Sequence, residues 1–170
     1  KLDTKIKTII LPFGINKKDI NKNPLKKINN KCIFFSRLHN QKGLDILIKA
    51  WIEINNKNWS LDIVGLGNPK YYKDLIGDKK IDIKFLKPVL NSSKKNVLFN
   101  HYDFLALPTT SENFGLVILE SLASGLPVLT TNETPWIDIQ NKNAGWLINY
   151  SEVELRLVLN QIFNTKDKEF

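Results

Sequence analysis

The sequence predicts a three-layer α/β fold, in which a doubly wound parallel sheet lies between two layers of helices. Short apolar runs alternate with helix-length amphipathic segments over residues 31–163, a pattern typical of parallel sheets covered by helices. The 170 residues, 42% of them hydrophobic, suffice for one sizeable core but are cramped for two. No repeat or linker interrupts this stretch. We expect one domain over residues 31–170, after a lead-in strand and a polar connection over residues 1–30.

The strands are predicted by short runs of apolar side chains. Most of these runs are continuous, as expected for strands that are covered on both faces. Ile81, Ile83 and Phe85 instead alternate with polar residues, which indicates a half-exposed strand. Pro108 ends the fourth strand, and each crossover between neighbouring strands is expected to be right-handed. The predicted strands are 32–35, 61–64, 81–85, 103–107, 128–130 and 144–148.

The helices are predicted by apolar side chains at helical spacing and by residues that favour helix ends. Asn68 caps a helix with Pro69 at its first position, and Gly125 ends a later one. Ser151 and Glu154 form a capping box ahead of the final amphipathic helix. The predicted helices are 44–52, 68–80, 92–100, 114–124 (starting at Phe114 or Gly115), a short segment after Thr134-Pro135, and 151–163.

The net charge of +8 is concentrated at the start of the chain. Residues 1–31 hold nine lysines against two aspartates, so they carry +7 of the total. A solvated surface is the simplest interpretation, and a face attracted to an anionic membrane is the alternative. Nucleic-acid binding is not expected, because no aromatic residues are interleaved with the lysines and no nucleic-acid motif accompanies them.

Cysteine usage and hydropathy indicate a soluble protein of a reducing, cytoplasmic compartment. Cys32 is the single cysteine, so neither a disulfide nor a thiolate zinc site is available. No run of about twenty apolar residues occurs, and the start of the chain lacks a signal-peptide pattern. His39 and His101 have no metal-ligand spacing, so no metal site is expected.

Ligands of an open parallel sheet bind beyond the carboxyl ends of its strands, so the loops after the strands are the candidate sites. The loop 36–43, SRLHNQKG, places Arg37 and Lys42 before a helix, with Gly43 allowing a tight turn. Two cations beside a helix N-terminus suit a diphosphate. The alternative is a pair of solvated surface cations, although Arg37 is one of only two arginines in the chain.

The loop GLGN, residues 65–68, resembles a fragment of a dinucleotide fingerprint but lacks its full spacing. A tight turn at Gly65 is therefore the simpler interpretation. In the last loop, TNETPW, the side chain of Trp136 is more typical of packing than of a sugar platform.

The segment 109–120, TTSENFGLVILE, is the richest in polar chemistry. Glu112 and Glu120 are eight residues apart, so one lies in a loop and the other in the helix that follows. The turn 113–115 directs N–H groups forward from the start of that helix. A polyhydroxylated ligand attached to a phosphate fits this pattern. The alternative is one helix-start carboxylate and one on a solvated face.

The combined motifs SRxxxxKG, VGxG and LPTTSENFGLVILESLASGLPVLTT identify a resemblance to a known family. From about Thr8 to Phe163 the chain resembles the C-terminal, Rossmann-like domain of GT-B glycosyltransferases of family 4, also called group 1. The strongest element is the E-x7-E signature, Glu112 to Glu120. The segments TPW and GWLI resemble bacterial transferases of lipopolysaccharide core and surface polysaccharide.

The resemblance implies a site for a nucleotide-sugar donor. Arg37 and Lys42 would bind the diphosphate and stabilise the leaving nucleotide, Glu112 would bind sugar hydroxyls, and Glu120 would bind the ribose. Lys87-Pro88 stands where the family commonly has a glycine, beside the loop that borders the base. The catalytic residues implied are Arg37, Lys42 and Glu112. The donor-binding set implied is Arg37, Lys42, Gly65, Val89, Glu112, Asn113, Phe114, Gly115, Leu116 and Glu120.

The activity implied is retaining transfer of a hexose to a bacterial glycan or glycolipid such as lipopolysaccharide core, without metal or cofactor. Family members take their acceptor site from an N-terminal domain that no segment of this sequence resembles. We therefore expect nucleotide binding without meaningful transfer by this chain. Two alternatives remain open at this stage: half of a GT-B nucleotide-sugar 2-epimerase, and a non-catalytic doubly wound interaction module.

Overall fold

The computed structural model describes residues 14, 20 and 29–165, and it confirms the predicted fold class. Six parallel strands form one sheet in the order β3-β2-β1-β4-β5-β6. The lysine-rich segment and the predicted lead-in strand lie almost wholly outside the described residues. The strands are β1 (Lys31–Phe35), β2 (Ser60–Val64), β3 (Ile83–Leu86), β4 (Phe104–Leu107), β5 (Val128–Thr131) and β6 (Gly145–Ile148).

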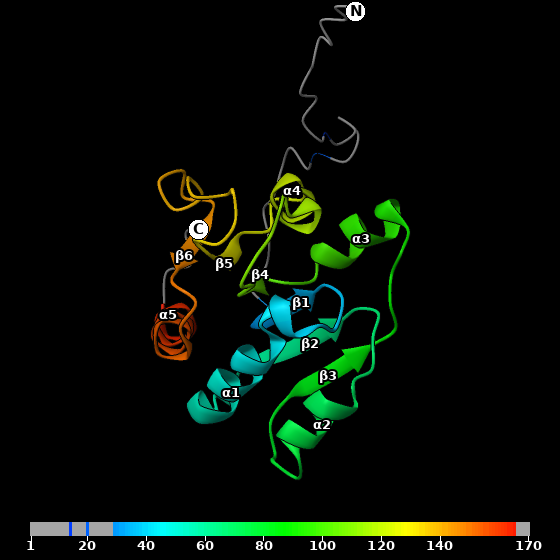
Figure 1. Ribbon diagram of the computed structural model, residues 1–170, viewed down its shortest axis with the longest axis vertical. Coiled ribbons are helices and arrows are strands. Elements are labelled where there is room, and N and C mark those ends of the chain that lie inside the picture. Colours follow the sequence, from blue (N-terminus) through cyan, green and yellow to red (C-terminus); the bar gives the residue numbers. More distant parts are fainter. Residues whose placement is uncertain (1–13, 15–19, 21–28, 166–170) are drawn as a thin grey trace, which may run out of the picture.

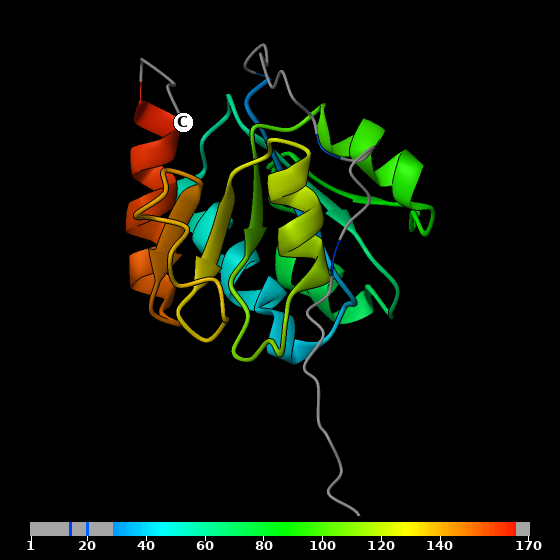
Figure 2. The same ribbon diagram turned by 90° about the horizontal axis from the view of Figure 1, so that it is seen from above.

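The helices cover both faces of the sheet. Helices α1, α2 and α5 lie on one face, and α3 and α4 lie on the other (Figures 1 and 2). This arrangement is the three-layer, doubly wound architecture that the sequence predicts. The helices are α1 (Leu44–Ile54), α2 (Lys70–Ile76), α3 (Ser92–Phe99), α4 (Leu116–Ala123) and α5 (Glu152–Asn164), with a short 3-10 helix η2 (Asn40–Lys42) before α1.

The core is richest in aromatic side chains where α1 and α5 meet the sheet. Trp59 stacks on Phe163 with ring centroids 4.7 Å apart, and Trp51 meets the same ring edge-on at 5.0 Å. On the sheet, Phe104 packs against Trp59 at 5.7 Å and against Trp146 at 5.8 Å. Each large ring buries a large apolar area, so this cluster anchors the last helix.

Buried polar groups at the amino-terminal end of the sheet are paired. The Tyr102 hydroxyl donates to Asp62 Oδ2 at 2.7 Å, and burial together with this bond raises the pKa of Tyr102. Asp103 accepts the Lys31 N–H at 2.7 Å, which ties the start of β1 to the start of β4. Burial raises the pKa of the Cys32 thiol, so this thiol stays protonated.

Two details of the predicted elements are wrong. The short helix expected after Thr134-Pro135 is a series of turns over residues 137–143, which ends at Asn143 in a left-handed conformation (φ 51°). The capping box is only half formed, because Ser151 accepts from the Glu154 N–H while the Glu154 carboxylate accepts from the Asn149 N–H instead. A bond from the Asn149 side chain, and second the bond from its backbone N–H, lower the pKa of Glu154.

The end of α2 is also predicted wrongly, because the helix stops at Ile76, before Gly77 with its φ of +55°, and does not reach Lys80. The other bounds agree within one or two residues of the prediction. Strand β3 starts at Ile83 rather than Ile81, and β4 starts at Phe104. Asn68 accepts from the Lys70 N–H at 2.9 Å, as a capping side chain would, but the N-cap of α2 is Pro69 and the helix begins one residue later than expected. No helix among the described residues is long and apolar enough to cross a membrane.

Backbone segments approach each other closely at the carboxyl edge of the sheet. Gly43 has φ of +67°, and a Cβ atom there would lie 1.8 Å from the Pro108 carbonyl oxygen. A Cβ atom on Gly65 would lie 1.7 Å from the Ser36 carbonyl oxygen. These glycines let the loop after β1 lie directly against the loops that follow β2 and β4.

We predict that Gly43→Ala destabilises the protein by about 3 kcal/mol or prevents folding, because both the clash and the left-handed backbone oppose a side chain. The control is Asn55→Ala at the other end of α1, where φ is +48° and the residue is exposed. It should lose only about 1 kcal/mol. Urea unfolding followed by circular dichroism measures both. Equal losses would contradict the close-contact account.

Candidate functional site

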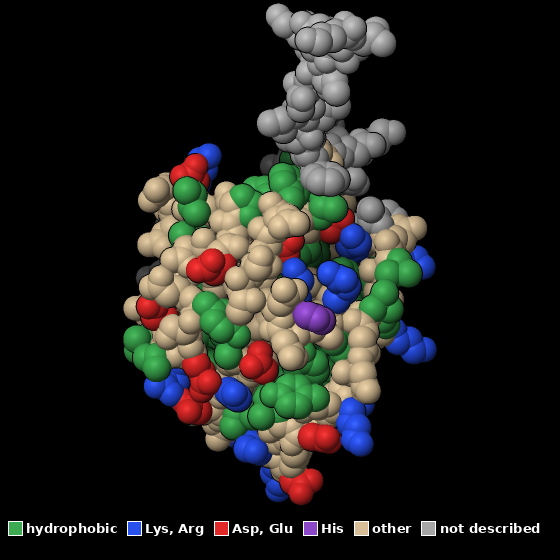
Figure 3. All heavy atoms as spheres, in the orientation of Figure 1, with side chains coloured by type: hydrophobic (Ala, Val, Ile, Leu, Met, Phe, Trp, Pro, Cys, Tyr) green, Lys and Arg blue, Asp and Glu red, His purple; other side chains and the backbone are tan. Residues whose placement is uncertain are grey.

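The candidate site lies where the strand order reverses. β1 and β4 are neighbours in the sheet, but their helices cover opposite faces, and the loops that follow them lie at the edge of the sheet where doubly wound folds bind their ligands. The loop after β1 carries Arg37 and Lys42, and the loop after β4 carries Glu112. Lys and Arg side chains gather beside acidic side chains and a histidine on one face of the molecule (Figure 3).

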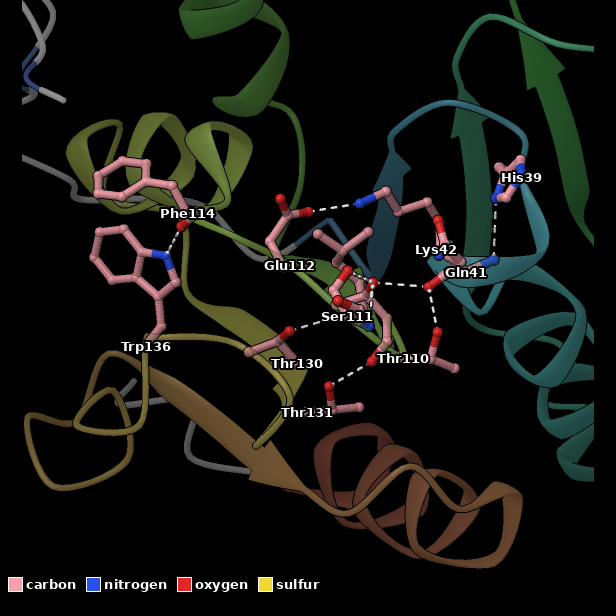
Figure 4. Close-up of polar contacts among 12 residues, drawn as sticks. His39, Gln41, Lys42, Thr110, Ser111, Glu112, Phe114, Thr130, Thr131 and Trp136 are labelled. Carbon is pink, nitrogen blue, oxygen red and sulfur yellow. Dashed lines mark hydrogen bonds and ion pairs between the residues drawn. The ribbon is translucent and has the colours of Figure 1, made fainter.

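An ion pair joins the two loops. Lys42 Nζ lies 2.7 Å from Glu112 Oε2, and the two side chains are 12% and 19% exposed (Figure 4). Both residues are members of the predicted donor set, and the structure brings them into direct contact across 70 residues of sequence. The lysine ammonium has three N–H donors, so two remain for another acceptor. A cation and an anion are therefore held side by side with capacity for a further polar ligand.

Threonine side chains fix the two loops to each other. Thr109 Oγ1 donates to the Gln41 carbonyl at 2.7 Å, and the Thr110 N–H donates to the same carbonyl at 2.8 Å (Figure 4). Thr131, at the end of β5, donates to the Thr109 carbonyl at 2.6 Å. The polar residues 109–111 thus position Glu112 through hydrogen bonds to backbone atoms of neighbouring strands and loops, which limits the freedom of the ion pair.

Helix α1 begins beside this pair. Its N-cap is Gly43, which has no side chain to satisfy the first N–H groups of the helix. Those N–H groups and the helix dipole place a partial positive charge near Lys42. Arg37 is exposed and makes no ion pair with any described residue. The loop after β1 therefore offers an anion three kinds of donor: an ammonium, a guanidinium and backbone N–H groups.

The first turn of α1 also contains one acidic side chain. Asp45 is in the first turn of α1, and its Oδ1 atom is buried and has no hydrogen bond partner among the residues that the structure describes. Burial first, and the Asp45 charge second, raise the pKa values of Tyr72 and Tyr150.

The turn before α4 is held by an indole ring. Trp136 Nε1 donates to the Phe114 carbonyl, and the rings of Phe114 and Trp136 meet edge-on at 5.7 Å (Figure 4). The packing interpretation of Trp136 is confirmed. Gly115 is the N-cap of α4 with φ of +75°, and Leu116 is 45% exposed as the first helical residue. Asn113 is exposed in the same turn.

Glu120 has a partner that the sequence analysis missed. Lys95, on α3, places Nζ 2.6 Å from Glu120 Oε1. Nothing in the sequence marks this lysine, because it is one of 23 and lies in a helix with no motif. The other members of the predicted set, Gly65 and Val89, follow β2 and β3 at the same edge of the sheet.

A cavity of about 710 Å³ lies elsewhere, next to the amino-terminal ends of β5 and β6. Its lining includes Pro127, Gln140, Trp146 and Gln161, none of which is charged. It shares no residue with the predicted donor set. Within the described residues, no three His, Cys, Asp or Glu side chains gather as metal ligands would.

Comparison with known proteins decides the family. Residues 29–158 match the family model described as "Glycosyl transferases group 1". This chain belongs to the group 1 glycosyl transferases. An uncharacterized glycosyltransferase of Haemophilus influenzae is 30% identical over 140 residues, which cover 78% of this chain and 39% of the relative. The chain therefore spans about two fifths of the length of this relative.

Solved structures of glycosyltransferases share the fold. The C-terminal domain of the group 1 protein LpcC from Francisella tularensis has a TM-score of 0.73 at 21% identity, with 89% of each chain covered. WaaG, a glycosyltransferase involved in lipopolysaccharide biosynthesis, has a TM-score of 0.71 at 28% identity, with 85% of this chain and 40% of WaaG covered. The predicted C-terminal half of a GT-B fold is confirmed.

The Lys42–Glu112 pair is predicted to couple the two loops energetically. A double-mutant cycle with Lys42→Met and Glu112→Gln should give a coupling of about 1–2 kcal/mol in urea unfolding, because both groups are largely buried. The control cycle uses Lys84→Met and Asp82→Asn, whose side chains are 62% and 47% exposed at 2.9 Å. It should give less than about 0.5 kcal/mol. Similar couplings in the two cycles would contradict this account.

Proposed function

We propose that this chain is the nucleotide-sugar donor-binding half of a retaining glycosyltransferase that transfers a hexose to a bacterial glycan or glycolipid. The observation that carries the proposal is the Lys42–Glu112 pair beside the uncapped start of α1. A nucleotide sugar combines an anionic diphosphate with neutral hydroxyls. Lysine and backbone N–H groups can donate hydrogen bonds to the diphosphate, and carboxylates can accept hydrogen bonds from the hydroxyls.

The roles follow from this chemistry. Arg37 and Lys42 bind the diphosphate and stabilise the negative charge that develops on the leaving nucleotide. Glu112 accepts hydrogen bonds from sugar hydroxyls, and its contact with Lys42 keeps the sugar next to the diphosphate. Glu120 accepts the ribose hydroxyls, and the N–H groups of Phe114, Gly115 and Leu116 meet the sugar or phosphate. Val89 borders the base, and Gly65 and Asn113 complete the donor site.

Retention and the type of acceptor rest on named relatives. One relative is the alpha-monoglucosyldiacylglycerol synthase of Streptococcus pneumoniae, whose name describes an α-linked glucosyl lipid. It is 26% identical over an alignment of 188 positions, which covers 96% of this chain and 41% of the relative. Common donors such as UDP-glucose carry an α-linked hexose, so an α-linked product corresponds to retention. The role of WaaG in lipopolysaccharide biosynthesis supports a glycolipid or lipopolysaccharide core acceptor here.

The proposed reaction also needs an acceptor site, which this chain does not supply. In our proposal a second, N-terminal domain supplies the acceptor site and the other wall of the crevice, so this chain alone binds the nucleotide without meaningful transfer. The reaction needs neither metal nor cofactor, because the cations of the loop after β1 neutralise the leaving group. We place the enzyme in the cytoplasm, in peripheral contact with the inner face of the membrane where lipid acceptors lie.

Calorimetric titration with UDP, GDP and ADP tests the donor site. We expect one nucleotide to bind with micromolar to millimolar affinity, and Arg37→Ala or Lys42→Met to weaken it about tenfold or more, because a charge-assisted hydrogen bond is lost. The matched control is Arg156→Ala, which removes the other arginine, paired with Glu53 between α5 and α1. It should leave the affinity unchanged.

Two results would contradict the proposal. One is that none of the three nucleotides binds to wild-type protein whose circular dichroism spectrum shows it to be folded. The other is that Arg156→Ala weakens binding as much as Arg37→Ala does, since the effect of Arg37 would then be one of overall charge.

A further inference from the structure

Lys95 is a partly buried cation at the edge of the candidate site, on a helix that carries no member of the predicted donor set. Its Nζ atom lies 2.6 Å from Glu120 Oε1, and the two side chains are 17% and 19% exposed. The same ammonium lies 5.8 Å from the ring centroid of Phe35, the last residue of β1. Lys95 therefore directs its charge toward the carboxyl end of β1, where the Arg37 loop begins.

The position of Lys95 is fixed by the contacts of α3. Phe99 meets the Phe35 ring edge-on, with centroids 5.5 Å apart. Asn96 accepts a hydrogen bond from Ser124, next to the end of α4, at 3.2 Å. Both contacts are made by residues that follow Lys95 within the next turn of α3, and they hold this part of the helix against β1 and the end of α4. Lys94, the preceding residue, is exposed and makes no ion pair with a described residue, so it is not part of this arrangement.

The pairing leaves Glu120 with unused acceptor capacity. Oε1 accepts from Lys95, and Oε2 has no hydrogen bond to any described residue. A carboxylate has about four lone-pair sites, so a clamped Glu120 still accepts hydrogen bonds from both hydroxyls of a ribose. The lysine also neutralises the carboxylate, which otherwise repels the diphosphate of the same ligand. Without the Lys95 ion pair, the Glu120 carboxylate is no longer held in one orientation and its negative charge is no longer neutralised.

We propose that Lys95 is a positioning residue of the donor site, which clamps Glu120 so that its carboxylate recognises the ribose of the donor nucleotide. This inference rests on the proposed function and extends it to α3. Preference for a ribonucleotide over its 2′-deoxy counterpart then depends on a residue outside the E-x7-E segment.

The test is titration of wild type, Lys95→Met, Lys95→Arg and Lys94→Met with UDP, GDP and ADP and with their 2′-deoxy counterparts. Wild type and Lys94→Met should prefer the ribonucleotide about tenfold, the effect of one charge-assisted hydrogen bond. Lys95→Met should reduce this preference to less than about twofold, and Lys95→Arg should keep most of it. If the role of Lys95 were purely structural, Lys95→Met would weaken the binding of the ribonucleotide and of its 2′-deoxy counterpart equally, and the ratio of the two affinities would not change.

A second variant tests the inference even if Lys95→Met does not fold. Glu120→Gln should remove the same preference, and the double variant should lose no more than either single one, because the two residues act as a unit. The inference is overturned if Lys95→Met keeps the wild-type ratio, or if wild type binds a nucleotide without preferring ribose. Failure of wild type to bind any nucleotide is a different result, because it overturns the proposed donor site itself.

Discussion

The site depends on the close approach of the loop after β1 to the loop after β4. Gly43 lies against the Pro108 carbonyl, and the Gln41 carbonyl accepts from both Thr109 and Thr110. Only with the two loops in contact do Lys42 and Glu112 reach 2.7 Å. The same glycine leaves the start of α1 without a side-chain cap, so its N–H groups stay available. One backbone constraint thus produces both the ion pair and the adjacent helix start without a side-chain cap.

Each carboxylate of the E-x7-E segment is paired with a lysine from another element. Glu112 pairs with Lys42 from the loop after β1, and Glu120 pairs with Lys95 from α3. An anionic donor would be repelled by two partly buried carboxylates without cationic partners. The lysines offset that repulsion and leave acceptor oxygens for hydroxyls. Arg37 adds an exposed cation that no described acidic residue neutralises.

The sequence predicts the fold well because its apolar runs are short and separated by capping and turn residues. It fails after Pro135, where Ile139 is buried in a turn whose i+4 hydrogen bond imitates one turn of helix. The site residues are predicted through the loops after the strands, but their pairing is not. Lys42 and Glu112 are 70 residues apart, and only the sheet order makes them neighbours. Lys95 is missed because it is one of 23 lysines, and only the packing of α3 beside α4 brings it to Glu120.

The central claim is that the crevice at the carboxyl edge, between the loops after β1 and β4, binds the donor nucleotide. Nuclear magnetic resonance of the ¹⁵N-labelled chain titrated with UDP, GDP and ADP tests it most directly, because each amide reports its own surroundings. The account predicts that the amide shifts cluster at residues 36–46 and 110–120. Shifts confined to the uncharged cavity beside Trp146 and Gln161, at the opposite end of the sheet, would contradict it.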